Sequence, residues 1–176
     1  MNFQGIFQLK PESGKMEFYP IDFEKFPFLT QIKEDSKGNI WMSTRQDGII
    51  YYDKQKESIR KIQNNPVNPE SLISNRVLSI CIDRGDNIWI GTQFGISKTS
   101  IKEKQFNVLV PDNTPEFEFD NKIHKVFEDS YGNIWCSTYS NKLYVYDKNL
   151  KIKHIFSEKN GQNNFVGSDY FSFCED

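Results

Sequence analysis

The sequence has few of the features that mark membrane-spanning or nucleic-acid-binding chains. No stretch approaches the roughly 18 consecutive apolar residues that a membrane-spanning helix needs, and the start MNFQGIFQLK lacks the long apolar core of a signal peptide. We therefore expect no membrane contact by this segment itself. The 22 Lys and Arg residues are scattered among 24 Asp and Glu, which leaves a net charge of −2. Without a basic patch to follow phosphates, nucleic acid is not expected as a partner.

Cysteine and histidine are also scarce, with three and two residues respectively. Cys81, Cys136 and Cys174 each fall within a strand pattern, so we predict buried free thiols and no disulfide framework. His124 and His154 lie far apart and have no Cys or carboxylate at ligand spacing, which argues against a metal site. No glycine loop of the phosphate-binding kind occurs, and we expect no cofactor.

Aromatic residues and an internal repeat are what the chain does have. Phe, Trp and Tyr make up 15% of the residues, and such side chains favour strands. The hexapeptide Asn39-Ile-Trp-Met-Ser-Thr44 returns at 87–92 and 133–138, and Trp41, Trp89 and Trp135 lie 48 and then 46 residues apart. A period of this length, with about four short alternating strands in each repeat, is typical of β-propeller blades.

We therefore predict an all-β fold in which each blade has four antiparallel strands, and the chain is a fragment of a larger propeller. Three full blades are expected at 28–62, 75–110 and 121–156. A partial blade at 1–20 supplies a third and a fourth strand, and 165–176 supplies the first strand of a further blade. Since the end blades are incomplete, the expected macromolecular partners are a second copy of the chain or neighbouring blades.

An acidic turn precedes each hexapeptide. Asp35, Asp83 and Asp129 can accept backbone N–H bonds at the turn, and a following glycine supplies the left-handed residue that the reversal needs. The second repeat has Asp86 at that place, so either Asp86 adopts the left-handed conformation or the hairpin uses another turn type. The three tryptophans are expected to bury against the neighbouring blade, with the indole N–H bonded to a partner.

Paired carboxylates at Glu34-Asp35, Glu128-Asp129 and Glu175-Asp176 could suggest glycoside hydrolysis. A catalytic pair is needed once, whereas these pairs recur once per blade at a turn, so we interpret them as structural. A calcium loop is equally disfavoured, because the alternating oxygen ligands of such loops are missing. We predict no catalytic residue and no enzyme activity. An enzymatic propeller would need a single non-repeating catalytic cluster.

The pattern Ile-x-x-Ile-x-Glu-Asp-x-x-Gly-Asn-Ile-Trp-x-x-Thr, followed by Gly-Ile and Tyr-Asp, resembles the two-component regulator propeller repeat. The resemblance implies the periplasmic sensor region of a hybrid histidine kinase of gut bacteria, built as tandem seven-bladed propellers. It also implies that the signal is a product of polysaccharide breakdown. No kinase residues are present in this chain, although the parent protein of such a region is a histidine kinase.

Loops that differ between repeats are where a propeller would bind a ligand. The loops between second and third strands carry residues that could stack on a sugar or hydrogen-bond it, namely Arg45, Gln93, Phe94, Tyr139 and Asn141. The long connectors 63–74 and 110–121 are alternative contact surfaces. The sequence thus predicts a sensor fragment that binds an oligosaccharide, with a structural or protein-interaction propeller as the alternative.

Overall fold

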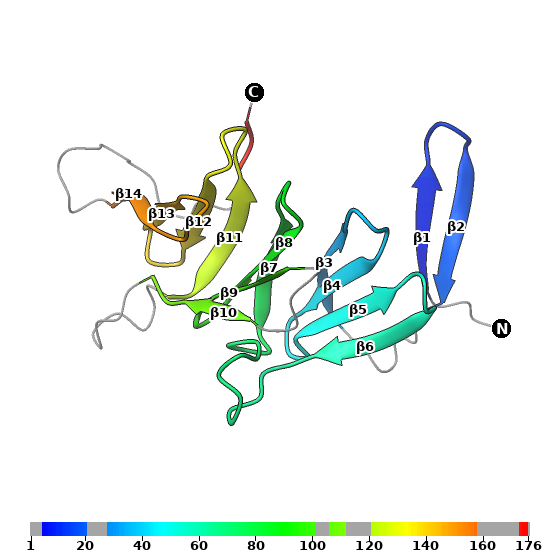
Figure 1. Cartoon of the computed structure of the whole chain (residues 1–176), viewed down its shortest axis with the longest axis horizontal. Coiled ribbons are helices and arrows are strands. Elements are labelled where there is room, and N and C mark those ends of the chain that lie inside the picture. Colours follow the sequence, from blue (N-terminus) through cyan, green and yellow to red (C-terminus); the bar gives the residue numbers. More distant parts are fainter. Residues whose placement is uncertain (1–4, 21–27, 101–105, 112–120, 158–172, 176) are drawn as a thin grey trace.

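The computed structural model describes residues 5–20, 28–100, 106–111, 121–157 and 173–175. Within these ranges every regular element is a β-strand. The strands form three antiparallel four-stranded sheets, ordered β3-β4-β5-β6, β10-β9-β8-β7 and β11-β12-β13-β14, and a hairpin of β1 with β2 (Figure 1). The prediction of an all-β fold of four-stranded blades is confirmed.

The strand boundaries follow the repeat. The hairpin consists of β1 (Gly5–Lys10) and β2 (Lys15–Pro20). The first blade consists of β3 (Leu29–Glu34), β4 (Ile40–Thr44), β5 (Ile49–Asp53) and β6 (Ser58–Ile62). The second consists of β7 (Val77–Ile82), β8 (Asn87–Thr92), β9 (Gly95–Ser100) and β10 (Asn107–Leu109). The third consists of β11 (Ile123–Glu128), β12 (Ile134–Thr138), β13 (Leu143–Tyr146) and β14 (Ile152–Phe156).

The first strands of the three blades, β3, β7 and β11, lie next to one another. A side chain of each preceding inner strand accepts a hydrogen bond from the backbone of the next inner strand. The backbone N–H of Ile80 donates to the Gln31 side-chain oxygen at 2.8 Å, and that of Val126 donates to the Ser79 hydroxyl at 2.9 Å. These bonds give each inner strand a defined position relative to the next.

The hydrophobic core lies mainly between blades. One cluster joins the first blade to the second through Trp41, Ile49, Tyr51, Leu72, Val77, Ile80, Ile88 and Ile90. Another joins the second to the third through Trp89, Ile96, Ile123, Val126, Ile134, Cys136, Tyr144 and Tyr146. Trp41 is 4% exposed and Trp89 is 1% exposed. Each of these two indoles therefore fills the interface between its own blade and the following one.

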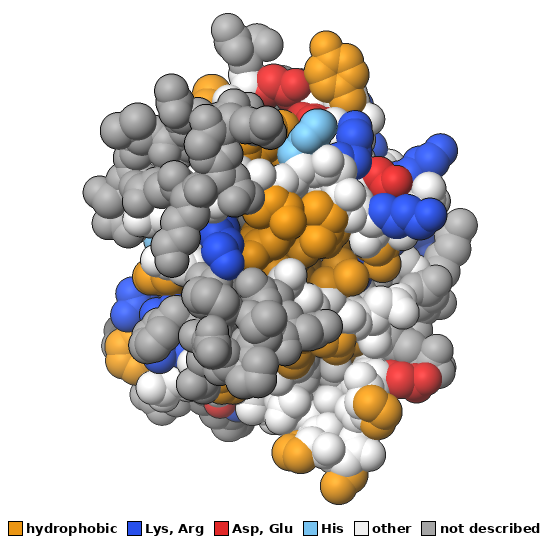
Figure 2. All heavy atoms as spheres, turned by 90° about the vertical axis from the view of Figure 1, so that its left-hand side faces the viewer, with side chains coloured by type: hydrophobic (Ala, Val, Ile, Leu, Met, Phe, Trp, Pro, Cys, Tyr) orange, Lys and Arg blue, Asp and Glu red, His pale blue; other side chains and the backbone are white. Residues whose placement is uncertain are grey.

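The third tryptophan lies at a face of the third blade that no other described blade covers, which we call the open face. Trp135 is only half-buried and lines a cavity of about 530 Å³ together with Phe127, Phe156 and Phe173. Its ring stacks on Phe156 with the centroids 6.1 Å apart. Figure 2 views this side of the molecule and shows hydrophobic side chains gathered at its centre. Association of this chain with a second copy or with further blades stays a prediction.

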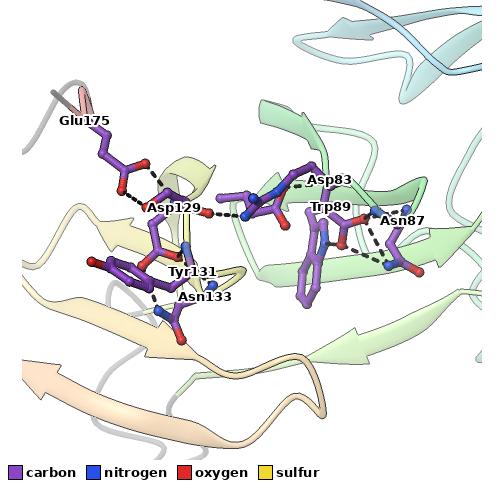
Figure 3. Close-up of polar contacts among 11 residues, drawn as sticks. Asp83, Asn87, Trp89, Asp129, Tyr131, Asn133 and Glu175 are labelled. Carbon is purple, nitrogen blue, oxygen red and sulfur yellow. Dashed lines mark hydrogen bonds and ion pairs between the residues drawn. The ribbon is translucent and has the colours of Figure 1, made fainter.

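Each tryptophan is also held by the aspartate of its own turn. The indole N–H donates to the carboxylate six residues earlier in Trp41–Asp35 (2.9 Å), Trp89–Asp83 (2.8 Å) and Trp135–Asp129 (2.8 Å). The same carboxylates accept the side-chain amides of Asn39, Asn87 and Asn133 and the backbone N–H groups of these asparagines. We call this arrangement the Asp-Asn-Trp bracket; Figure 3 shows it in the second blade and shows its aspartate and asparagine in the third.

The second blade's turn uses Asp86 in the left-handed conformation. Its φ is 60°, where Gly38 and Gly132 have φ of 79° in the other two turns. The carboxylate of Asp86 accepts the Ser36 hydroxyl at 2.5 Å, so this residue also connects its blade to the preceding one. Of the two possibilities left by the sequence, the structure shows the first.

The paired carboxylates act as connectors between neighbouring turns. Glu128 accepts the backbone N–H of Arg84 at 2.9 Å. Glu175 accepts the backbone N–H and the hydroxyl of Ser130 at 2.7 and 2.6 Å (Figure 3). The second blade has Ile82 at the equivalent place, and there Asp86 bonds Ser36 instead. Recurrence of these carboxylates thus has a structural explanation.

Two details differ from the predicted pattern at the end of the chain. Cys174 is exposed and lies outside any strand, so the prediction of a buried strand thiol was wrong there, whereas Cys136 is buried and Cys81 is partly buried. The predicted strand at 165–176 falls mostly outside the described residues, and residues 173–175 are not in a strand. A side-chain contact joins this segment to the third blade: the Phe173 ring stacks on Phe127, with the ring centroids 5.8 Å apart.

The bracket predicts a pH dependence of stability. Burial alone raises the pKa of the Asp129 carboxyl, but hydrogen bonds from Trp135, Asn133 and the backbone outweigh it, and the pKa lies below its ordinary value. Such a group stabilises the fold above its unfolded pKa of about 3.9, and the contribution is lost as pH falls through the folded pKa.

We therefore expect the free energy of unfolding to fall as pH is lowered from about 5 to about 2, and Asp129→Asn to make that fall shallower. Urea unfolding over this pH range measures it. Glu12→Gln, at an exposed position in the β1–β2 turn, serves as the control. Equal pH slopes in wild type and Asp129→Asn would contradict the role of this carboxylate.

Candidate ligand-binding site

A polar cavity of about 440 Å³ lies where the inner strands of the three blades begin. All three blades contribute to it. It is lined by Leu29, Thr30, Arg45, Arg76, Leu78, His124, Lys125 and Tyr139. We call it the axial cavity.

A β-bulge in each inner strand positions part of this lining. The pairing register shifts between Leu29 and Gln31, between Val77 and Ser79, and between Ile123 and Lys125. The residues inside the three shifts are Thr30, Leu78 and His124, and all three line the cavity. Bulges are frequent beside functional sites because they redirect a side chain that regular pleating would place elsewhere.

The loops after the second strands are tied to the same end of the molecule. The backbone N–H of Arg45 donates to the Phe28 carbonyl at 3.3 Å, and that of Tyr139 donates to the Lys122 carbonyl at 3.0 Å. In the second blade the N–H of Gln93 donates to the Arg76 carbonyl at 3.3 Å. Each loop is thereby fixed beside the residues that lead into its own inner strand.

The axial cavity is cationic. Arg45, Arg76 and Lys125 contribute three positive side chains, and the lining among the described residues includes neither Asp nor Glu. In the described part of the chain, the ion pairs involve other cations: Lys10, Lys54, Lys56, Lys61 and Arg84. Arg45 and Arg76 are exposed, and Lys125 is half-buried. The cavity therefore concentrates positive charge in a chain whose net charge is negative.

Tyr139 is the aromatic residue of the lining and is 42% exposed. The Lys122 ammonium lies 3.9 Å from its ring centroid, a cation–π contact, and the His124 ring meets it edge to face at 4.8 Å. These neighbours hold the ring in place. They also occupy part of its surface, which limits the area available for stacking on a sugar.

The loop residues proposed from the sequence divide into two groups. Arg45 and Tyr139 line the axial cavity, whereas Gln93, Phe94 and Asn141 do not. Phe94 is 45% exposed, and Asn141 has a φ of 59° within the β12–β13 turn. The sequence did not identify Arg76 or Lys125 as site residues, and His124 was considered only as a metal ligand, a role that the sequence disfavours. The available sequence signal was that the aligned position differs between repeats, with Gln31, Ser79 and Lys125.

The described residues give less support to thiol chemistry or metal binding. Burial raises the pKa of the Cys81 thiol to about 11 and that of Cys136 still further, which disfavours the reactive thiolate. No group of three or more His, Cys, Asp or Glu is placed there to hold a metal ion. Nor does a helix long and apolar enough to cross a membrane occur in that part of the chain.

Comparison with known proteins agrees with the repeat. The family described as "Two component regulator propeller" matches residues 71–94 and 118–140. "Histidine kinase P4" of Formosa agariphila is 32% identical over an alignment of 208 residues, which covers 91% of this chain and 15% of that protein. The chain therefore spans only a small part of this curated relative.

Solved structures show the same fold. The extracellular domain of the putative hybrid two component system BT3049 from B. thetaiotaomicron aligns with a TM-score of 0.51 and 18% identity, over 85% of this chain and 27% of that one. Virginiamycin B lyase from Staphylococcus aureus aligns with a TM-score of 0.62 and 13% identity, over 88% of this chain and 48% of that one. At these identities the likeness concerns the propeller fold alone.

Proposed function

Because the chain is built from two-component regulator propeller repeats, we propose that it is a periplasmic, ligand-sensing part of a two-component receptor and binds an oligosaccharide in the axial cavity. The observation that supports this best is the cavity itself, which draws side chains from three blades. A ligand there would contact all three at once, so binding could alter how the blades pack.

The size and lining of the cavity suit a small saccharide. Its volume of about 440 Å³ lies in the range of roughly 300–1,000 Å³ usual for ligand sites. Arg45 and Arg76 can donate several hydrogen bonds to hydroxyl or acidic groups, and Tyr139 contributes an aromatic side chain that is 42% exposed. No catalytic step is part of this proposal.

The experiment is a calorimetric titration with oligosaccharides first selected by a thermal-shift screen. We expect Tyr139→Ala to raise the Kd for a selected oligosaccharide about tenfold, which corresponds to about 1.4 kcal/mol. Phe94→Ala, which removes an exposed aromatic from the equivalent loop outside the cavity, should leave the Kd unchanged. Both variants should keep the free energy of unfolding within about 1 kcal/mol of wild type, since exposed loop changes are usually mild. Equal Kd values in the two variants would contradict binding in the axial cavity.

A protein-interaction module is the second candidate. The apolar face around Trp135 and Phe156 supports it, because the corresponding faces of the first two blades are covered by a neighbouring blade. Light scattering over a range of concentrations tests it. A compact monomer at every concentration would speak against self-association through this face.

A further inference from the structure

We infer that the axial cavity selects a saccharide bearing carboxylate or sulfate groups, which bind to Arg45, Arg76 and Lys125. This inference rests on the proposed function and goes further by specifying the ligand's charge. Three cationic residues from three different blades line one cavity, and the described residues of that lining supply no carboxylate to balance them.

Two carboxylates that lie close in sequence to these cations, and that the structure describes, already have partners. Asp47, in the same β4–β5 loop as Arg45, pairs with Lys61 at 3.4 Å and accepts no bond from the arginine. Glu128, three residues after Lys125, accepts from Arg84, and its oxygen lies 3.5 Å from the Arg84 guanidinium. Neither of these two carboxylates therefore neutralises the positive charge of the axial cavity, which can attract an anionic ligand or solvent ions.

The cations are attached to well-placed backbone. Arg45 follows β4 and is tethered to Phe28, whereas Arg76 directly precedes β7. Lys125 belongs to β11, at the position where Gln31 and Ser79 of the other blades reach the next inner strand. A binding site whose residues lie on strands or directly beside their ends loses less conformational entropy on binding than one carried by a mobile loop.

Bringing three like charges together is unfavourable unless an anion compensates them. A guanidinium forms paired hydrogen bonds with carboxylate and with sulfate-like groups, and such charge-assisted bonds are about twice as strong as neutral ones. A neutral sugar would leave the repulsion in place. Uronic acids and sulfated sugars share the required chemistry, and the experiment below separates them.

The test is a calorimetric titration of this chain with three disaccharides of equal length: a neutral one, one with a uronic acid and one with a sulfate group. We expect at least one acidic disaccharide to bind at least tenfold more tightly than the neutral one, and a rise in salt from about 50 to about 300 mM to weaken that binding. Which acidic disaccharide binds more tightly identifies the preferred group.

Single substitutions test whether the acidic disaccharide binds in the axial cavity. Arg45→Gln and Arg76→Gln should each weaken acidic binding at least tenfold and change neutral binding little, whereas Lys148→Gln, at an exposed position in the β13–β14 turn, should change neither. Circular dichroism and thermal melting check that each variant folds.

The outcomes separate the two hypotheses. If the neutral disaccharide binds as tightly as both acidic ones, the inference is overturned while the proposed function stands. If tripolyphosphate binds as tightly as the acidic sugars and depends on the same arginines, the site recognises charge alone, and the inference is likewise overturned. If no saccharide of any charge binds, the proposed function fails and the inference fails with it.

Discussion

Trp89→Ala is expected to lower the free energy of unfolding by about 3–5 kcal/mol, the usual cost of truncating a buried tryptophan. The ring is 1% exposed and packs between the second and third blades with Ile123 and Val126. Lys98 covers it as well, with its ammonium 4.9 Å from the ring. Since a domain of this kind has a total stability of only about 5–15 kcal/mol, much of it would be lost.

Two further variants separate packing from hydrogen bonding. Trp89→Phe keeps an aromatic ring but loses the N–H that donates to Asp83, so it should cost less than Trp89→Ala. Trp135→Ala removes the same residue type with the same bracket from a half-buried position at the open face, and its cost should also be smaller. Urea unfolding monitored by circular dichroism measures all three. A loss below about 1 kcal/mol for Trp89→Ala would rule out the role between blades.

Local chemistry explains why much of the fold could be predicted. The Asp turn, the hexapeptide and the strand that follows lie close together in sequence and occur three times, and the following strand carries tyrosines in the first and third repeats. The position of the Trp41 ring within its blade depends on a bond to Asp35 only six residues away. Repetition made such local features visible, although the sequence alone did not identify the aspartate as the partner of the indole N–H.

Contacts between blades were harder to predict because they join residues nearly fifty positions apart. The bond from Arg84 to Glu128 and the bond from Ile80 to Gln31 depend on how two sheets pack. Glu128 was interpreted as structural only because its pair recurs, and its partner could not be inferred. Asp86 replaces that link in the second blade through a different residue position, which no alignment of the repeats would suggest.

The axial cavity was only partly predictable, because some of its residues lie in variable loops and others depend on how the blades pack. Arg45 and Tyr139 were found because their loops differ between repeats. Arg76 and Lys125 were missed because their contribution depends on where the inner strands begin and on a bulge in each. A bulge shifts which side chains face the cavity, and strict alternation assigns those positions wrongly.

The second large effect is expected for Asp35→Ala, at about 3 kcal/mol of lost stability. Asp35 is 5% exposed and accepts bonds from Trp41, from both nitrogens of Asn39 and from the backbone N–H of Lys37, all within 3.0 Å. Alanine would leave several of these donors without an acceptor in a buried place, and each such orphan costs roughly 1–3 kcal/mol. The individual costs do not add, because the donors share one carboxylate and can relax together.

Asp53→Ala provides a matched control for this variant. Asp53 starts the β5–β6 turn and accepts the backbone N–H groups of Gln55 and Lys56 at 3.1 Å, but it receives no indole N–H. Because that turn is exposed, water can replace the lost carboxylate, and the cost should stay near 1 kcal/mol or below. Urea unfolding of both variants gives the comparison. Equal losses would mean that Asp35 acts as an ordinary turn residue, and that holding Trp41 in place depends on packing between the blades alone.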